Sequence, residues 1–252
     1  MQIEELLNIA KKAAVLAGEE ILKIYNSEDF FIEYKDDKSP LTIADKKANA
    51  IIEKYLIKTK IPILSEEGKH SDFIERRKWN KLWIVDPLDG TKEFIKRNGE
   101  FTVNIALIKD NSPILGVIYV PVKKILYFAS DKGAFKKSGD IIQKLPVNKK
   151  KKKYVAVGSR SHMSEETQDF FDKLKENHGE IEIVSMGSSL KICLVAEGIA
   201  DVYPRFAPTM EWDTAAGHAI AKFAGKKFID YSTMQEMKYN REKLLNSWFI
   251  VL

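Results

Sequence analysis

An apolar segment leads directly into two carboxylates in the stretch Trp83-Ile84-Val85-Asp86-Pro87-Leu88-Asp89-Gly90-Thr91. Asp86 and Asp89 are three residues apart, and the proline and glycine near them indicate a turn at the end of a strand. Carboxylate oxygens are the ligands that hard divalent cations such as Mg²⁺ prefer. This stretch therefore predicts a site for such a cation.

Three further acidic residues are candidates for the same site. Asp45 begins an apolar-periodic segment, Glu66 follows a short apolar run, and Asp213 follows a tryptophan. Each has an ordinary structural explanation, because a capping box explains Asp45 and a helix N-cap explains Asp213. Likewise, a hairpin turn explains Asp89 and an exposed loop explains Glu66. If the carboxylates converge, the site is that of a two-metal phosphate-ester hydrolase.

The local sequence around Asp86 favours convergence. Pro87 lacks a backbone donor, so a regular central strand is not expected to continue past Asp86. The apolar residues before Asp86 predict its burial, and a buried carboxylate without a partner is costly. Two carboxylates about 4 Å apart repel each other by about 4 kcal/mol at an effective dielectric of 20. A bound Mg²⁺ would remove that penalty.

The same turn predicts a seat for a phosphate group. Gly90 allows close approach, and residues 91–94 can open a short helix whose free amides face an anion. The Thr91 hydroxyl lies at the same place. A hydroxyl backed by a carboxylate can orient and deprotonate an attacking water molecule.

The elements that must position these residues follow from the apolar periodicity. In the first part of the chain we expect two helices followed by an antiparallel meander. The helices are expected over residues 3–24 and 44–56, and the strands over 61–64, 81–85, 101–108, 114–120 and 125–129.

After a lysine run the pattern changes to strands and helices in alternation, which predicts βαβ units and a more parallel sheet. The strands are expected over 154–158, 181–184 and 200–203, and the helices over 164–177, 188–197 and 214–224. We therefore predict a mixed α/β (α+β) fold with two halves. Residues 1–145 form an antiparallel-sheet half with two helices and most ligands, and residues 146–252 form an α/β half with Asp213 and the nucleotide-binding segments.

The composition indicates an ordinary soluble globular protein. The chain has 252 residues, of which 44% are hydrophobic and 31% charged, and a formal net charge of +5. No apolar run is long enough to cross a bilayer, and no signal peptide is expected at the N-terminus. One cysteine, Cys193, excludes an internal disulfide and fits the cytoplasm.

The lysine run over residues 149–153 has three interpretations. It can be a solvated loop between the two halves, or it can steer a polyanionic substrate. It can also attract anionic lipid headgroups by about 1 kcal/mol per lysine, which would place the protein peripherally on the inner face of the cell membrane. No nucleic-acid-binding motif is present, so we expect no nucleic-acid partner. The sequence sets no oligomeric state.

At its acidic motifs the chain resembles the lithium-sensitive, Mg²⁺-dependent inositol monophosphatase superfamily. The superfamily signatures D-P-x-D-G-T and W-D-x-A-A-G match residues 86–91 and 212–217, with Glu66 and Glu67 as the usual upstream acids. Within the superfamily the chain is similar to the CysQ branch of 3'(2'),5'-bisphosphate nucleotidases. That similarity is carried by residues 39–42, 91–105, 158–162 and 244–246.

The resemblance implies the αβαβα layered sandwich of the inositol monophosphatase and sugar phosphatase type. It also implies two or three Mg²⁺ ions per site, with Asp45 and Thr91 orienting the attacking water. The implied metal ligands are the carboxylates of Glu66, Asp86, Asp89 and Asp213 and the backbone carbonyl of Leu88.

The resemblance further implies where a nucleotide would bind. His162 is equally well explained as an exposed loop histidine. Arg160, Lys191 and Arg205 suit a second phosphate that the metal ions do not hold. The implied substrate contacts are Glu66, Leu88, Asp89, Gly90, Thr91, Ser159, Arg160, His162, Ser188, Lys191, Arg205 and Asp213.

The activity that the resemblance implies is hydrolysis of adenosine 3',5'-bisphosphate to AMP and phosphate. 3'-Phosphoadenylyl sulfate would be a second substrate, and the setting would be sulfur metabolism. An inositol monophosphate or fructose-1,6-bisphosphate phosphatase on the same site is the nearest alternative. A metal or nucleotide sensor without activity is the alternative of another class.

Overall fold

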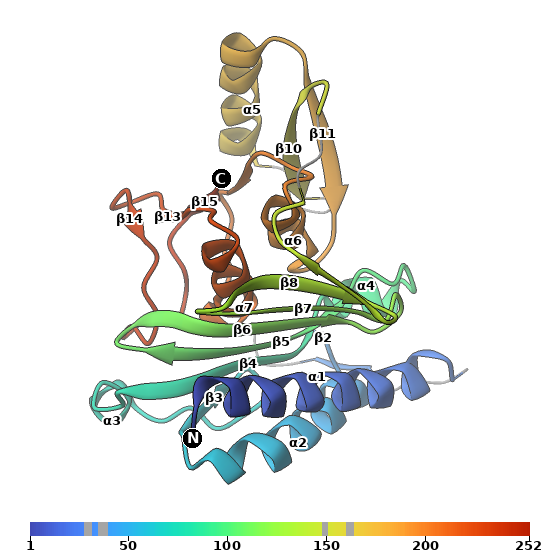
Figure 1. Ribbon diagram of the computed structural model, residues 1–252, viewed down its shortest axis with the longest axis vertical. Helices are drawn as coiled ribbons and strands as arrows, with labels where there is room; N and C mark the ends of the chain where they lie inside the picture. Colours follow the sequence, from blue (N-terminus) through green and yellow to red (C-terminus); the bar gives the residue numbers. More distant parts are fainter. Residues whose placement is uncertain (28–31, 35–39, 148–150, 160–163) are drawn as a thin grey trace.

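The computed structural model describes residues 1–27, 32–34, 40–147, 151–159 and 164–252, with the backbone alone at 32–34, 40, 41 and 159. Its largest element is a seven-stranded sheet in the order β3-β4-β5-β6-β7-β8-β9 (Figure 1). β3 and β4 are parallel and every other neighbouring pair is antiparallel. The strands are β3 (Ile63–Ser65), β4 (Lys81–Asp89), β5 (Thr102–Lys109), β6 (Ser112–Val120), β7 (Ile125–Ser130), β8 (Gly133–Ser138) and β9 (Ile141–Lys144).

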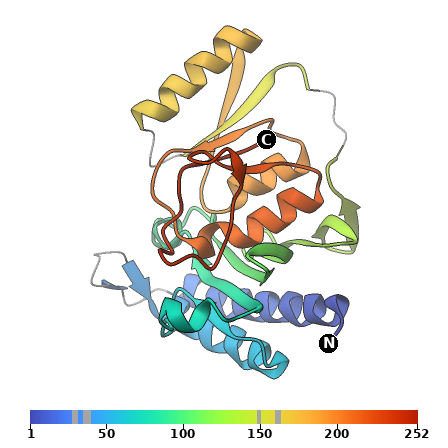
Figure 2. The ribbon, with the colours of Figure 1, turned by 90° about the vertical axis from the view of Figure 1, so that its left-hand side faces the viewer.

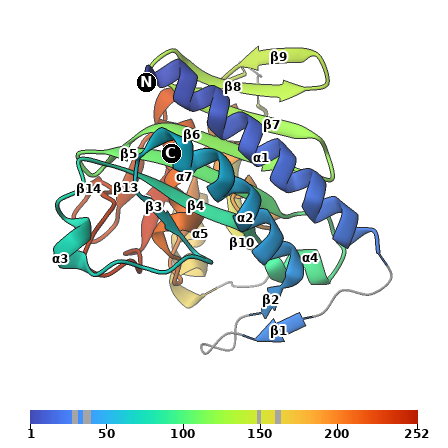
Figure 3. The ribbon, with the colours of Figure 1, turned by 90° about the horizontal axis from the view of Figure 1, so that it is seen from below.

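Alternating side chains of the central strands pack on opposite faces of this sheet. In β4, Trp83 and Val85 face one hydrophobic cluster, whereas Leu82 and Ile84 face another. The cluster around Trp83 is closed by α1 (Ile3–Tyr25) and α2 (Ile43–Leu56), which lie together across the sheet (Figure 3). Both helices agree with the expected ranges.

The other face of the sheet is covered by α6 (Leu190–Glu197) and α7 (Glu211–Phe223). α7 approaches β6 very closely at Gly116, where an added Cβ would lie 2.5 Å from the Ala216 carbonyl oxygen and 2.6 Å from Ala219 Cβ. The absence of a side chain at this position therefore sets how near α7 lies to the sheet.

Beyond α6 and α7 lie further strands and the helix α5 (Glu165–His178) (Figures 1 and 2). The molecule is thus layered as helices, sheet, helices, strands and helix, which confirms the αβαβα architecture. Two strands form a parallel pair, and four others form a sheet in the order β12-β15-β13-β14. The strands are β10 (Tyr154–Ser159), β11 (Ile181–Met186), β12 (Tyr203–Arg205), β13 (Phe228–Asp230), β14 (Gln235–Glu236) and β15 (Phe249–Val251).

The expectation of a more parallel sheet in this half holds for two of the three strands that were expected, and β13, β14 and β15 were not expected. Only β10 and β11 pair in parallel as a βαβ unit, whereas β12, β13, β14 and β15 pair antiparallel. β13, β14 and β15 follow α7 with no further helix between them, so no crossover is available to make them parallel. β8 and β9 were not expected either. β9 is exposed along its whole length and has no apolar alternation, and β8 is exposed at its C-terminal end.

The remaining elements are short, and they are β1 (Ile32–Tyr34), β2 (Pro40–Thr42), η1 (Ile57–Thr59), α3 (Phe73–Arg76) and α4 (Thr91–Ile95). Among the described helices, none has the length and apolar character needed to cross a membrane. The division of the chain between residues 145 and 146 remains a proposal about its organisation. The two halves share a hydrophobic core, because one cluster contains Ile84 of β4 together with Ile192 of α6.

Candidate active site

β4 carries two of the predicted ligands at its C-terminal end. β4 extends beyond the expected end at Val85, and its pairing with β5 shifts register between Asp86 and Asp89. The proline in this segment therefore interrupts the regular ladder without ending the strand. Asp86 is 1% exposed, and its Oδ1 accepts a hydrogen bond from the Leu88 amide at 3.1 Å.

Glu66 reaches the same place from the neighbouring strand. β3 is parallel to β4, and the Glu66 amide continues their pairing by donating to the Val85 carbonyl at 3.1 Å. Two acidic residues that are distant in the sequence thus leave the sheet at the same end. Parallel pairing explains this placement, because it brings the carboxyl ends of both strands to one edge.

Asp45 is a helix-capping residue and also lies next to Thr91. Its Oδ2 accepts hydrogen bonds from the Thr42 amide at 2.7 Å and the Thr42 hydroxyl at 2.6 Å, which completes the capping box of α2. Its Oδ1 lies 3.4 Å from Thr91 Oγ1, which is also 3.3 Å from the Leu88 carbonyl oxygen. The ordinary explanation is therefore correct, and it leaves the second carboxylate oxygen available for Thr91.

Asp213 lies in the first turn of α7. The helix begins at Glu211 rather than at Thr214, so Asp213 is its third residue and not its N-cap. The Met210 amide donates to Asp213 Oδ2 at 2.8 Å. Glu211 is fully buried and accepts hydrogen bonds from the backbone amides of Asn240 and Arg241, at 2.6 and 3.0 Å, which explains the earlier start of the helix.

These residues surround one cavity of about 480 Å³. Its walls include Glu66, Asp86, Leu88, Asp89, Gly90, Thr91, Arg205 and Asp213. The structure therefore brings the predicted metal ligands together, with Asp45 contacting Thr91 from behind. Within the described ranges, no three carboxylate, histidine or cysteine side chains lie close enough together to hold a metal ion as they stand.

The electrostatics of the cavity show an excess of negative charge. Burial raises the pKa of Asp86 well above its ordinary value, and Glu66, Asp89 and Asp213 raise it further by repulsion. Burial also raises the pKa of Asp213, with repulsion from Asp89 as the next cause. Burial raises the pKa of Asp45 to about 6, although its hydrogen bonds from Thr42 act in the opposite direction.

This chemistry fits a hard divalent cation. The walls offer carboxylate oxygens and one backbone carbonyl, which are the donors that Mg²⁺ takes. The repulsion that raises the pKa of Asp86 is relieved by a positive ion, in the same way that a cation reverses the local pKa logic of other metal sites. The roles of the individual ligands remain predictions.

Asp89 also connects β4 to the beginning of α6. Its Oδ2 lies 2.6 Å from the Ser188 hydroxyl, 2.6 Å from the Ser189 amide and 2.6 Å from the Ser189 hydroxyl, all of which can donate to it. Asn104 Nδ2 donates to the same oxygen at 3.2 Å. The Ser189 hydroxyl is also 2.8 Å from the Asp213 carbonyl oxygen. We call Asp89, Thr102, Asn104, Ser188 and Ser189 the Asp89 cluster.

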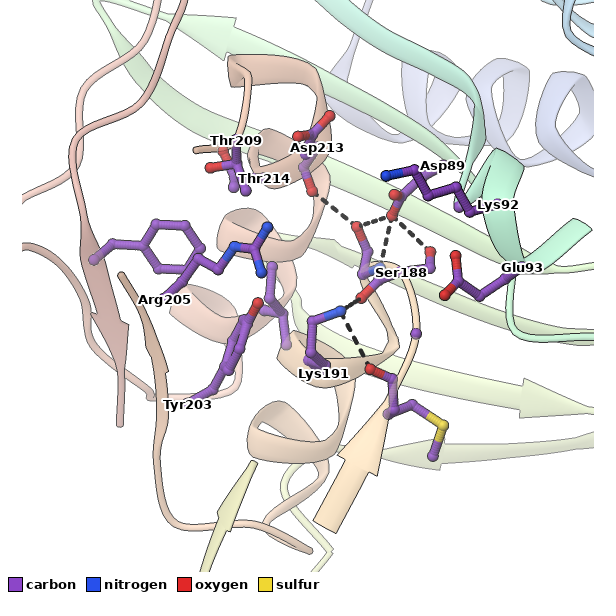
Figure 4. A pocket seen from close by; sticks show the side chains of 16 residues that line it. Asp89, Lys92, Glu93, Ser188, Lys191, Tyr203, Arg205, Thr209, Asp213 and Thr214 are labelled. Carbon is purple, nitrogen blue, oxygen red and sulfur yellow. Dashed lines mark hydrogen bonds between the residues drawn. The ribbon is translucent and has the colours of Figure 1, made fainter. Parts of the chain in front are cut away.

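A second cavity, of about 160 Å³, adjoins the first and shares Asp89, Arg205 and Asp213 with it (Figure 4). Lys191 is 8% exposed and donates to the Ser188 carbonyl oxygen at 2.6 Å. Burial lowers the pKa of Lys191 to about 8. Arg205 Nε is buried without a hydrogen-bond partner in the described chain. This cavity therefore has a cationic wall with unused donor capacity.

Of the predicted substrate contacts, five that line the first cavity have been described, and they are Glu66, Leu88, Asp89, Thr91 and Asp213. Gly90, Ser188, Lys191 and Arg205 line the second cavity. The backbone of Ser159 ends β10, whereas Arg160 and His162 lie outside the described residues. Ser188 was expected on the first turn of a helix with Lys191, but α6 begins at Leu190. Ser188 instead has a left-handed φ of 54° and reaches Lys191 through its carbonyl group.

Sequence reasoning missed several residues of the site. Thr102 and Asn104 pair across from Asp89 and Asp86, so alternation along β5 turns both toward the ligands. Ser189 has no signal beyond the Gly-Ser-Ser segment in which it lies. Glu93 also belongs to the site, because it lines both cavities.

Comparison with known proteins agrees with this geometry. The model of the inositol monophosphatase family matches residues 2–248, so the chain belongs to that family. A relative from Salmonella typhimurium, named 3'(2'),5'-bisphosphate nucleotidase CysQ, is 44% identical over 99% of this chain and 98% of its own length. A relative of the same name from Buchnera aphidicola is 47% identical over 92% of this chain and 88% of its own length.

A solved structure is similar over nearly the whole chain. The crystal structure of CysQ from Bacteroides thetaiotaomicron, described as a bacterial member of the inositol monophosphatase family, has a TM-score of 0.92 and 52% identity. The match covers 99% of this chain and 97% of that chain. The family resemblance, the layered fold and the family's hydrolytic chemistry are thereby confirmed, and the family's phosphatases are metal-dependent.

Proposed function

We propose that the chain is a Mg²⁺-dependent phosphomonoesterase that hydrolyses the 3'-phosphate of adenosine 3',5'-bisphosphate to AMP and phosphate. The observation that carries this proposal is the single cavity that Glu66, Asp86, Asp89 and Asp213 line together with Thr91. 3'-Phosphoadenylyl sulfate has the same 3'-phosphate and is the proposed second substrate.

Two or three Mg²⁺ ions would be held by the four carboxylates and the Leu88 carbonyl oxygen. When bound, Mg²⁺ supplies Lewis-acid stabilisation to the phosphate oxygens and to the leaving oxygen. The protein's own contribution at this point is to keep the carboxylates buried and close to one another, as the raised pKa of Asp86 reflects. Ser189 and Asn104 hold Asp89 in place by hydrogen bonds.

Asp45 and Thr91 activate the attacking water in this proposal. Thr91 Oγ1 lies 3.4 Å from Asp45 Oδ1, so the hydroxyl can donate to the carboxylate while accepting a hydrogen bond from water. The proton of the water then has a route to Asp45, whose pKa of about 6 suits a general base near neutral pH. The water oxygen bonds to phosphorus, the bond from phosphorus to the 3'-oxygen breaks, and the 3'-oxygen leaves as a hydroxyl after taking a proton from solvent water, while Asp45 later returns its proton to solvent.

The second cavity supports a substrate with two anionic groups. Lys191 and Arg205 have no carboxylate partner within hydrogen-bonding distance in the described chain, and both line the wall beside the first cavity. A guanidinium and an ammonium in this place suit the 5'-phosphate, which is a second anionic group apart from the 3'-phosphate at the metal ligands. The names of the relatives from Salmonella and Buchnera support the same substrate.

A direct comparison of substrates tests the proposal. Phosphate release with Mg²⁺ is measured from adenosine 3',5'-bisphosphate, inositol 1-phosphate and fructose 1,6-bisphosphate, and then repeated with added Li⁺. We expect the nucleotide to be preferred and Li⁺ to inhibit. Preference for inositol 1-phosphate or fructose 1,6-bisphosphate would overturn the substrate assignment. Nucleotide binding without phosphate release would favour the sensor.

The proposed setting is the cytoplasm. Cys193 is buried and free, which agrees with a reducing compartment. Peripheral contact with the cell membrane through the lysine run remains a prediction, and of that run only Lys151, Lys152 and Lys153 lie in the described residues. Lys151 and Lys153 form ion pairs with Asp201 and Glu180, which supports the interpretation as a solvated loop.

A further inference from the structure

Glu93 is an acidic residue of the site to which neither the mechanism nor the metal ligation gives a role. It lies in α4, two residues after Thr91, and is 9% exposed. It lines both the cavity of the predicted metal ligands and the second cavity. Its carboxylate points into the second cavity toward Ser188, and Glu93 lies across this cavity from Arg205 (Figure 4).

The Glu93 carboxylate has no hydrogen bond or ion pair among the described residues, which sets it apart from two partly buried acids near it. Asp89 accepts several hydrogen bonds, and Glu100 accepts one from the Gly187 amide at 2.8 Å. The side chain is mostly buried but its oxygens face the cavity, so a ligand that displaces water from them without supplying a donor leaves a costly unpaired carboxylate. The site therefore contains an acceptor that a bound molecule can satisfy.

The surroundings of Glu93 hold the side chain at the cavity wall. A Cβ added at Gly187 would lie 2.8 Å from Glu93 Cγ, so the loop before α6 packs directly against it. Lys191 and Arg205 line the other side of the same cavity (Figure 4). The cavity thus has Lys191 and Arg205 on one side and the Glu93 carboxylate on the other, and it also includes Lys92 and the carboxylates of Asp89 and Asp213.

This polarity defines what a ligand must present at each wall. A second phosphate suits the side of Lys191 and Arg205 and would be repelled by Glu93. A metal ion is disfavoured on the side of Glu93 that faces the second cavity, because that cavity includes Lys191 but neither Glu66 nor Asp86. The remaining partner is a neutral hydrogen-bond donor. Glu93 follows Thr91 closely in α4, so that donor lies near the scissile phosphate.

We propose that Glu93 accepts a hydrogen bond from the ribose hydroxyl next to the scissile phosphate, and that it thereby selects ribonucleotides over 2'-deoxyribonucleotides. This inference rests on the proposed function. In adenosine 3',5'-bisphosphate the free 2'-hydroxyl is on the carbon beside the 3'-phosphate, which places a donor where the structure has an unused acceptor. Selectivity follows because a substrate without this hydroxyl leaves the buried carboxylate unpaired.

The test is a comparison of two substrates on four proteins. The substrates are adenosine 3',5'-bisphosphate and its 2'-deoxy analogue, and kcat/KM is measured for each with saturating Mg²⁺. The proteins are the wild type, Glu93→Ala, Glu93→Gln and the control Glu176→Ala, which removes an exposed glutamate of α5 far along the chain. The half-saturating Mg²⁺ concentration is measured for all four proteins.

In the wild type and the control we expect a preference of about tenfold or more for the ribonucleotide, as for a hydrogen bond to a charged group. In Glu93→Ala the ratio should fall to about one, and Glu93→Gln should retain part of it because the amide oxygen still accepts. Structural damage alone would lower kcat/KM equally for both substrates and leave the ratio of the two values unchanged.

Three results would overturn the inference. One is an unchanged ratio in Glu93→Ala, and another is the absence of any preference in the wild type. The third is a Glu93→Ala protein in which the half-saturating Mg²⁺ concentration shifts while the substrate ratio does not change, which would make Glu93 a metal ligand. A wild type that releases no phosphate from adenosine 3',5'-bisphosphate would instead overturn the proposed function, so the two failures are distinguishable.

Discussion

The charge of Asp45 should destabilise the metal-free protein in a way that depends on pH. The side chain is 3% exposed, and burial raises its pKa from the ordinary 3.8 to about 6. The folded state therefore binds more protons than the unfolded state between about pH 4 and pH 6, and stability falls as the pH rises through that range. A shift of this size corresponds to about 3 kcal/mol once Asp45 is ionised in both states.

Asp45→Asn removes this cost and keeps an acceptor for the donors of Thr42. In the presence of a chelator, we expect the variant to be more stable than the wild type by up to about 3 kcal/mol at pH 7.5. Near pH 4 the two proteins should have similar free energies of unfolding. At neutral pH the difference corresponds to a Tm shift of roughly 6 °C or more for a chain of this size. The same variant should lose most of its phosphatase activity.

Urea denaturation at pH 4.5, 6 and 7.5 measures these differences. Asp140→Asn, which removes an exposed carboxylate between β8 and β9, is the matched control for the change in net charge. A stability difference between wild type and Asp45→Asn that does not grow with pH would refute the reasoning. So would an Asp45→Asn protein that is less stable than the wild type at pH 7.5.

Three further substitutions test the rest of the site. Asp86→Asn should reduce turnover by more than about 100-fold, because a proposed metal ligand is lost, and should raise the Tm of the metal-free protein by relieving repulsion. Ser189→Ala removes a donor to Asp89 and should raise the half-saturating Mg²⁺ concentration by about 10- to 100-fold, measured in the activity assay. Arg205→Ala should cost the bisphosphorylated nucleotide about 2 kcal/mol in kcat/KM while leaving a small monophosphate nearly unaffected.

For each of these substitutions, one outcome would contradict the prediction. Full activity of Asp86→Asn would exclude Asp86 from metal binding. Ser232→Ala also removes a serine bonded to an aspartate, but away from the site, so an equal effect of that control on Mg²⁺ dependence would remove the role assigned to Ser189. Equal losses of both substrates in Arg205→Ala would show that Arg205 does not bind the second phosphate, and Arg77→Ala controls for loss of an exposed arginine.

The strand that carries Asp86 was predicted from a strong local pattern, whereas the layered fold was predicted from the family resemblance. The alternation of Leu82 and Ile84 with Trp83 and Val85 reflects burial on both faces of the sheet. β8, β9, β13, β14 and β15 were not predicted, and β12 pairs antiparallel with β15 where a more parallel sheet was expected. These short strands carry little pattern of their own, and their pairing is decided by contacts that are distant in the sequence.

The candidate site shows the same contrast. Its carboxylates could be named from motifs. That Asp45 both caps α2 and contacts Thr91 could be seen only in the structure, because the second contact depends on the placement of α4 beside α2. The donors that hold Asp89 come from the loop before α6, about a hundred residues away. No local pattern predicts such a hydrogen bond, because it exists only once α6 has packed on the sheet.

The closeness of α7 to β6 has a consequence for the geometry of catalysis. Gly116 lies in the middle of a strand and lines neither cavity, yet the space it leaves sets the distance between β6 and the helix whose first turn carries Asp213. A single methyl group there would act as a wedge under α7 and lift that carboxylate away from its partners. The accuracy of the reactive centre thus depends on a gap in the packing that touches neither substrate nor ion.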